Sequence, residues 1–230
     1  MRQHIDTIPI WEAYKRDTEC PLCDIELSNE EAYVESFLGA SVMEPITRVE
    51  VNEKGFCRRH FSMMFDAKNR LGLALIADTY LRETIGRIEA EAGRADKRPS
   101  RRGGGADGPS DGSRSCVICE RLGHTMERYR ETILHLWRRE PEFERALFAS
   151  KGFCLPHFSE MSALARERLG ADAASRLTDL QRTNLRRVER DLEWFTLKFD
   201  YRNQAAPWGE SRDAVERAIL KLRGKMRREA

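Results

Sequence analysis

Apolar residues recur along much of the chain at the spacing of one helix face. Between residues 122 and 137 they follow one another in steps of mostly three and four, which place them on a single stripe of an α-helix. Pro141 then marks the end of this helix or the start of the next. The stripe consists of Leu122, Met126, Tyr129, Ile133, Leu136 and Trp137.

Three other segments extend the helical pattern. Ser28 and Glu31 have the spacing of a capping box, which predicts a helix that starts at Ser28 and carries Phe37 and Leu38 on its apolar face. Longer apolar stripes cover residues 64–88 and 177–195. Residues 46–51 are the only short alternating candidate for a strand, and we expect a loop there, before Gly55. The pattern therefore predicts a mostly α fold.

The last predicted helix covers residues 211–227 and is amphipathic. Its apolar stripe is Val215, Ile219, Leu222 and Met226, and its other positions are largely basic. We expect a surface helix that docks on the remaining helices. A basic amphipathic helix also suits a membrane, an acidic partner or nucleic acid.

A four-residue motif occurs twice. Lys54-Gly55-Phe56-Cys57 returns as Lys151-Gly152-Phe153-Cys154, and each copy continues with His and Phe at the same offset. A Cys-x-x-Cys motif precedes each copy, and 33 residues separate it from the Cys-x-x-His motif that begins at Cys57, or 34 from the one that begins at Cys154. All six cysteines of the chain lie in these motifs. The pattern predicts two related helical repeats.

Three thiolates and one imidazole are a ligand set that zinc prefers. We assign one ion to each repeat, and expect each Cys-x-x-His motif to open a helix whose N-terminus faces the thiolates. Four protein ligands fill a tetrahedral shell, which favours structural sites over catalytic ones. The predicted metal ligands are Cys20, Cys23, Cys57 and His60 in the first repeat, and Cys116, Cys119, Cys154 and His157 in the second.

Other chemistries of the cysteines are less well supported. An iron–sulfur cluster also accepts three cysteines and one histidine, so it stays an alternative cofactor. Disulfides would leave one cysteine over in each repeat and would not explain the paired histidines. A thioredoxin-type motif needs a strand before it, and none is predicted. We expect His124 and His135 to be surface residues, and Asp24 and Glu120 to cap helices or face water.

Charge and composition narrow the functional classes. The 40 basic and 38 acidic residues nearly cancel, giving +2, which argues against a protein built mainly to grip nucleic acid. No apolar run approaches the ~20 residues of a membrane span, and no secretory signal is evident. We therefore expect a cytoplasmic protein. The predicted organisation is residues 1–92 as a first Cys3His repeat, 93–115 as a flexible linker, 116–203 as a second repeat, and 204–230 as the C-terminal basic helix.

Several motifs resemble a bacterial family known only as domain of unknown function 6062. They are Cys20-Pro21-Leu22-Cys23, Ser41-Val42-Met43-Glu44-Pro45, the segment 51–61 around Cys57, Asn69-Arg70-Leu71-Gly72-Leu73, and the ending Lys198-Phe199-Asp200-Tyr201-Arg202-Asn203 with Pro207-Trp208-Gly209. The resemblance covers nearly the whole chain. It implies a bacterial cytosolic protein and adds no activity.

These features favour a zinc-stabilised helical scaffold that binds a partner, most readily a protein, over an enzyme. A thiolate-based metal or redox sensor, or a metalloenzyme, is the first alternative. Nucleic-acid binding through the linker and the C-terminal helix is the second.

Overall fold

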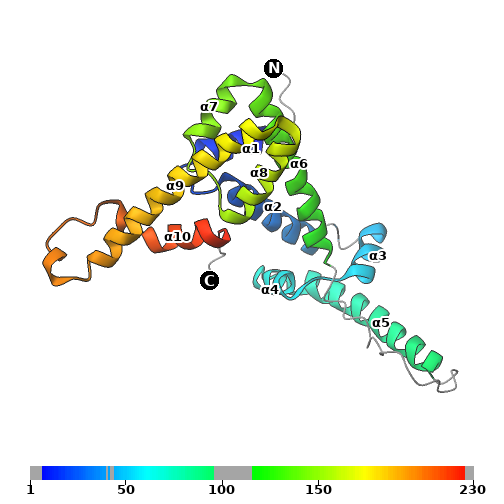
Figure 1. The fold of residues 1–230 in the computed structure, drawn as a ribbon. Helices are drawn as coiled ribbons and strands as arrows, with labels where there is room; N and C mark the ends of the chain where they lie inside the picture. Colours follow the sequence, from blue (N-terminus) through cyan, green and yellow to red (C-terminus); the bar gives the residue numbers. More distant parts are fainter. Residues whose placement is uncertain (1–6, 40, 42–43, 96–115, 226–230) are drawn as a thin grey trace, which may run out of the picture. The chain divides into compact units, whose positions relative to one another are not determined.

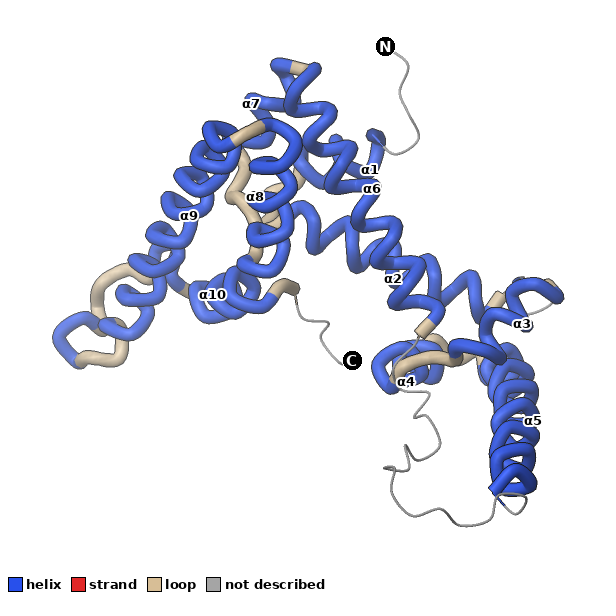
Figure 2. The backbone as a smooth tube through the Cα atoms, turned by 45° about the vertical axis from the view of Figure 1, so that its right-hand side comes forward, coloured by secondary structure: helices blue, strands red, loops and turns tan. Residues whose placement is uncertain are grey.

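A computed structural model describes residues 7–39, 41, 44–95 and 116–225 of the protein. These residues form ten α-helices and two short 3-10 helices, and the described part of the chain contains no strand (Figures 1 and 2). The predicted mostly α class is therefore confirmed. In chain order the α-helices are α1 (Thr7–Lys15), α2 (Pro21–Leu38), α3 (Pro45–Lys54), α4 (Arg58–Asp66), α5 (Arg70–Ala95), α6 (Val117–Arg139), α7 (Pro141–Ala149), α8 (Leu155–Leu169), α9 (Ala171–Leu197) and α10 (Ala214–Arg223).

The chain forms two compact units. Unit 1 consists of Met1–Ser28 and Thr125–Ala230, and unit 2 is Asn29–His124. The boundaries fall inside α2 and α6, so the units do not follow the two sequence repeats. Of the predicted linker, residues 96–115 lie outside the described residues, and residues 93–95 form the end of α5.

Unit 1 is built around α8 and α9, which pack along each other, with α10 against both and α1 against α7. Phe143 of α7 is completely buried. The rings of Trp11 and Tyr14 meet it edge-on, with centroids 5.2 and 5.0 Å away. Pro141 begins α7, as the sequence predicted, because proline needs no hydrogen-bond partner for its nitrogen in a first turn.

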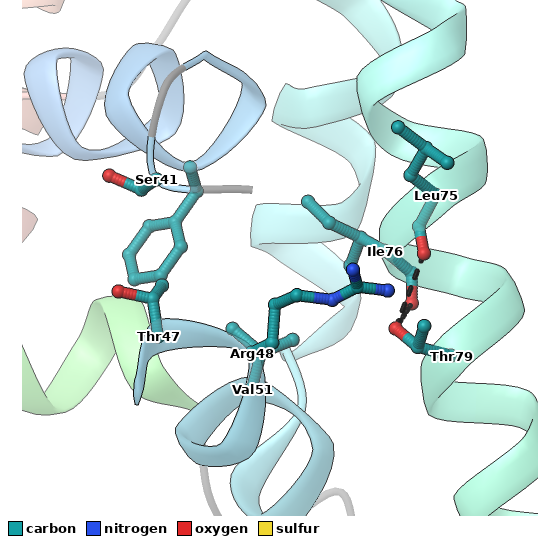
Figure 3. Close-up of a pocket in the computed structure, with 8 residues that line it drawn as sticks. Ser41, Thr47, Arg48, Val51, Leu75, Ile76 and Thr79 are labelled. Carbon is teal, nitrogen blue, oxygen red and sulfur yellow. Dashed lines mark hydrogen bonds between the residues drawn. The ribbon is translucent and has the colours of Figure 1, made fainter. Parts of the chain in front are cut away.

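Unit 2 has its own core around Phe56, the aromatic residue of the first repeated motif. Its ring lies edge-on to Phe37 and Phe61, at 5.3 and 5.4 Å between centroids. A cavity of about 10 Å³ lies nearby, where Arg48 extends from α3 towards α5 (Figure 3). That volume is at or below the ~10–15 Å³ that one water needs, so this space holds no substrate. Its lining is Phe37, Ser41, Thr47, Arg48, Val51, Leu75, Ile76 and Thr79.

Two local predictions are wrong. The helix expected from Ser28 begins at Pro21, so Ser28 lies in its interior and caps nothing. The loop expected over residues 46–51 is the helix α3, opened by Pro45. This helix buries only Thr47 and Val51, four residues apart, and such a narrow buried face leaves little helical periodicity to read.

The C-terminal helix also differs from the prediction. Its described extent is Ala214–Arg223 rather than residues 211–227, and residues 226–230 lie outside the described part. It docks on α8 and α9, as predicted, and buries Ala214 and Lys221. Val215, Ile219 and Leu222 of its apolar stripe are exposed, and hydrogen bonds from the Lys221 ammonium hold the other face.

Candidate metal centres

All four cysteine motifs lie at helix N-termini. Cys57 and Cys154 are the N-cap residues of α4 and α8, as predicted for the Cys-x-x-His motifs. Cys20 and Cys116 directly precede α2 and α6 in the same way. The second ligand of each motif is three residues further on, in the first helical turn, so both side chains of a motif share one face. Each motif thus turns two ligands and the positive end of a helix towards the same point.

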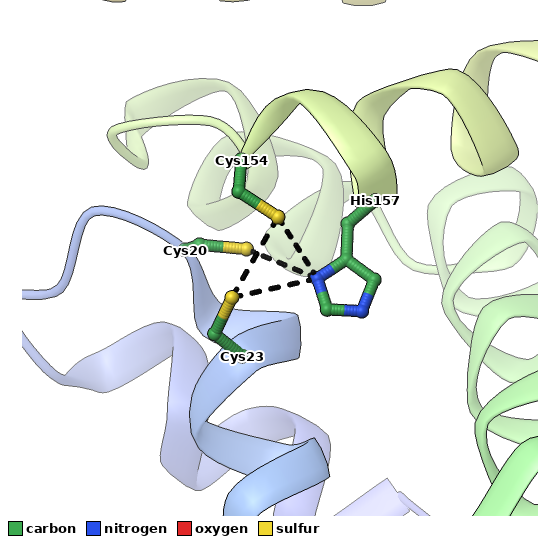
Figure 4. A group of neighbouring side chains, drawn as sticks. All are labelled: Cys20, Cys23, Cys154 and His157. Atoms are coloured by element: carbon green, nitrogen blue, oxygen red, sulfur yellow. Dashed lines mark hydrogen bonds between the residues drawn. The ribbon is translucent and has the colours of Figure 1, made fainter. Parts of the chain in front are cut away.

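The first quartet, the Cys20 cluster, consists of Cys20, Cys23, Cys154 and His157, all buried in unit 1 (Figure 4). The Nδ1 atom of His157 lies 3.5 Å from the Sγ of Cys20, 3.6 Å from that of Cys23 and 3.2 Å from that of Cys154. The Sγ atoms of Cys23 and Cys154 are 3.6 Å apart. A tetrahedral zinc site has S···S edges of about 3.8 Å and S···N edges of about 3.5 Å, so the quartet has the dimensions of such a site.

The second quartet, the Cys57 cluster, consists of Cys57, His60, Cys116 and Cys119 in unit 2. The Nδ1 atom of His60 lies 3.2 Å from the Sγ of Cys57, 3.2 Å from that of Cys116 and 3.4 Å from that of Cys119. The Sγ atoms of Cys57 and Cys119 are 3.8 Å apart. The ligand set and dimensions match those of the Cys20 cluster, but Cys119 is exposed and Cys57 only half-buried.

All eight predicted ligands lie in these clusters, but the predicted grouping is wrong. Each Cys-x-x-Cys motif meets the Cys-x-x-His motif of the other repeat. The reason is the helix that follows each Cys-x-x-Cys. α2 has 18 residues and α6 has 23, so they carry the chain about 27 and 35 Å away from the first pair of ligands. The next helices, α3 and α7, span only about 15 and 14 Å and are shorter than the helices before them.

The two Lys-Gly-Phe-Cys loops need their glycines. Gly55 and Gly152 have φ values of 68° and 75°, which residues with a Cβ atom rarely adopt. A Cβ atom at Gly55 would also lie 2.6 Å from the hydroxyl of Tyr80. The second loop is held by Gln181, whose amide donates to the Phe153 carbonyl at 2.8 Å and accepts from the Phe153 N–H at 3.0 Å. These two hydrogen bonds fix the loop that presents Cys154.

Each histidine of the clusters has a carboxylate near its Nε2 atom, the ring nitrogen that does not face the sulfurs. The Nε2 atom of His60 is 3.0 Å from Oε1 of Glu30, which is buried and also accepts from Arg59 at 2.6 Å. The Nε2 atom of His157 is 3.6 Å from Oε2 of the more exposed Glu26. Such partners orient a ligating imidazole and leave its other nitrogen for the metal. No sequence signal pointed to either glutamate, because both lie within a helix without a motif of their own.

The carboxylates that follow the Cys-x-x-Cys motifs are ion-paired. Asp24 is buried and lies 2.7 Å from the ammonium of Lys225, and Glu120 lies 2.6 Å from that of Lys54. The Lys225 backbone N–H also donates to the Sγ of Cys23, at 3.4 Å. Positive charge and N–H groups therefore surround thiolates that would carry a net charge near −1 around a divalent ion. Neither carboxylate is available as a general base without breaking its ion pair.

The side chains of the clusters strongly perturb one another. Burial alone would lower the pKa of His157, but hydrogen bonds with Cys154 and Cys23 outweigh it and raise the pKa to about 10. His60 behaves likewise, with a pKa also raised to about 10 against burial by its contacts with Cys116 and Glu30. Burial opposes ionisation of Cys116, yet the hydrogen bond from His60 and backbone N–H groups lower its pKa to about 6. Each cluster thus stabilises one thiolate, the form that binds metal, at Cys116 and at Cys154, whose pKa values are lowered. Burial and the neighbouring thiols raise the pKa of Cys119 to about 12 and that of Cys20 well above its ordinary value.

The structure also shows the state of the cysteines and of two further histidines. All six cysteines are free, so the disulfide alternative is excluded for this structure. His124 and His135 are exposed on α6, as expected for surface residues. No described helix is long and apolar enough to cross a membrane.

A family model described as a family of unknown function, DUF6062, matches residues 1–229. The chain belongs to the DUF6062 family. The match covers nearly the full length, as the sequence resemblance did. No curated protein and no solved structure matches the chain.

Proposed function

We propose that this member of the DUF6062 family is a zinc protein whose two Cys3His sites are structural and hold together a helical scaffold that binds a protein partner. One observation carries the metal assignment. Each of two quartets brings three sulfurs and one imidazole nitrogen together, within 4.8 Å of one another, from two helix N-termini that are far apart in the sequence. Zinc suits this soft, tetrahedral and closed ligand set best, with an iron–sulfur cluster as the alternative.

The order of elements supports two related repeats with exchanged metal-binding halves. A Cys-x-x-Cys motif, a long helix, a short helix, the Lys-Gly-Phe-Cys loop, a Cys-x-x-His helix and a second long helix occur in α2–α5 and again in α6–α9. Each repeat would then complete one site of its neighbour. A reducing, cytoplasmic location fits six free cysteines.

Exposed apolar side chains support a partner-binding role. On α5, Leu81, Ile85 and Ile88 are each more than half exposed and follow one another in steps of four and three. A helix that displays such a stripe is suited to a protein partner. Single exposed apolar residues are ordinary, but a stripe is not.

A second candidate, a thiolate-based redox or metal sensor, is favoured by one observation. Cys119 is exposed although its sulfur belongs to the Cys57 cluster, so an oxidant reaches a ligand directly. The nucleic-acid alternative depends largely on residues 96–115 and 226–230, which lie outside the described residues.

Elemental analysis of protein purified without added metal tests the metal proposal. We expect two zinc ions per chain, and cobalt substitution should give the visible spectrum of a tetrahedral ion bound by three sulfurs and one nitrogen. Chelation should remove both ions and much of the helical circular dichroism. Protein that folds fully without metal would contradict the proposal. Bound iron together with an intrinsic visible absorption band would show that the cofactor is an iron–sulfur cluster and not zinc.

A further inference from the structure

The C-terminal helix α10 faces the rest of unit 1 with two basic residues, Arg217 and Lys221. Lys221 is almost completely buried, and its ammonium donates to the carbonyl of Glu19 at 2.7 Å and to the carbonyl of Lys151. Arg217 lies 2.7 Å from Asp191 of α9 and 2.8 Å from Asp213. The helix therefore buries a lysine and turns its apolar stripe outwards. Val215 and Ile219 are each 36% exposed and Leu222 is 55% exposed.

This stripe borders a groove on unit 1. Two depressions of about 440 and 570 Å³ adjoin each other at Leu155, the first residue of α8. One lies between α8 and α9 and includes Phe158 and Leu185, and the other lies between α8 and α10 and includes Ile219 and Leu222. We call these two depressions together the α8 groove.

The α8 groove has an apolar floor and a mainly basic rim. Its charged lining residues are Arg182, Arg186 and Arg223 against Glu189, and Arg182 is ion-paired with Asp179 at 2.7 Å. The floor of the groove also adjoins the Cys20 cluster, because Leu155 and Pro156 lie in the sequence between its ligands Cys154 and His157. An apolar strip flanked by arginines matches a helix with one apolar and one acidic face.

A second copy of this chain fits the groove less well. Its exposed apolar side chains are few, with Leu155 37%, Val215 and Ile219 36% and Leu222 55% exposed, whereas each subunit of a stable dimer buries ~800 Å². Two copies would also bring basic rims together. We infer that the α8 groove binds an acidic amphipathic helix of a partner protein. The inference rests on the proposed function, for which it names the partner-binding site and the chemistry of the partner.

Two synthetic peptides test the inference on the full chain. Both are amphipathic helices of about 18 residues with leucines along one face; one carries glutamates on the other face and its twin carries lysines. In fluorescence anisotropy we expect the glutamate peptide to bind at least about tenfold more tightly than the lysine twin, and increasingly weakly as salt rises. Leu222→Asp, and separately Arg182→Glu with Arg186→Glu, should each weaken binding by about tenfold or more.

Matched controls are Leu197→Asp and Arg190→Glu, because both residues are exposed on α9 outside the groove. They should leave binding within about twofold. Equal binding of the two peptides, or binding that Leu222→Asp does not change, would overturn the inference. So would a dimer in sedimentation velocity that Leu222→Asp dissolves, because the occupant would then be a second copy.

Metal analysis of the same samples separates the two proposals. If the chain holds two zinc ions but does not bind the glutamate peptide, only the inference that the α8 groove binds an acidic helix is refuted. A chain without zinc that still binds the peptide through Leu222 refutes the metal centre alone.

Discussion

The Cys20 and Cys57 clusters have the same types of ligand, each placed at two helix N-termini. They differ in how far their ligands are shielded from solvent. All four ligands of the Cys20 cluster are buried, and Gly224 and Lys225 lie over Cys23 and Cys154. The Cys57 cluster leaves Cys119 exposed. The same ligand set can therefore serve two different ends: burial suits a site that only stabilises, and exposure suits one that exchanges or reacts.

The largest effect should come from removing ligands in pairs. Cys20→Ser with Cys154→Ser should release one zinc, because both residues belong to the Cys20 cluster. Cys20→Ser with Cys57→Ser should release both, although these residues lie in one sequence repeat. Each lost ion should cost several kcal/mol of unfolding free energy, less than the ~10–16 kcal/mol of isolated zinc peptides. Metal analysis and thermal melts check both pairs, and the opposite pattern would restore the within-repeat grouping.

The carboxylates behind the histidines should show the next effect. Glu30→Gln should weaken zinc binding at the Cys57 cluster by about 10–100-fold, because Glu30 is buried and orients His60. Glu26→Gln should affect the Cys20 cluster less, since Glu26 is more exposed and 3.6 Å from His157. Competition with a chromophoric chelator measures both affinities. Equal losses at the two clusters would show that burial of the carboxylate does not matter.

Loss of zinc to a chelator should be about tenfold faster from the Cys57 cluster than from the Cys20 cluster, because solvent reaches Cys119. Each cluster can be followed alone in the Cys154→Ser or the Cys57→Ser variant. Ending the chain after Arg223 removes Gly224 and Lys225, which lie over Cys23, and should narrow the difference between the two rates of zinc loss. If the shortened chain kept the full difference, the cover would not be its cause.

The smallest expected effect concerns the two glycines. Gly55→Ala should cost about 2 kcal/mol of unfolding free energy and Gly152→Ala about 1 kcal/mol, since both add strain at positive φ. The first costs more because its Cβ would press on Tyr80 at 2.6 Å, whereas at Gly152 the nearest atom, in Gln181, is 3.0 Å away. Urea denaturation checks the order, and a larger loss for Gly152→Ala would contradict it.

The sequence was sufficient for features that depend on neighbouring residues. The ligand types, the helices opened by Cys57 and Cys154, and the stripe of α6 all follow from local spacing. The pairing of motifs did not, because it depends on the lengths of α2 and α6, and the prediction started α2 seven residues late, at Ser28. The burial of Lys221 on α10 was not predicted, because the sequence does not show which backbone carbonyls the folded chain brings to its ammonium.

The crossed grouping also has a consequence during synthesis. Cys20 and Cys23 leave the ribosome early, but their partner His157 follows Cys23 by 134 residues. At ~5–20 residues per second, the first pair of thiols waits roughly 7–27 s for the other half of its quartet. Throughout that interval the nascent chain carries an unfinished pair of cysteines, so its early thiols depend on the reducing power of their surroundings.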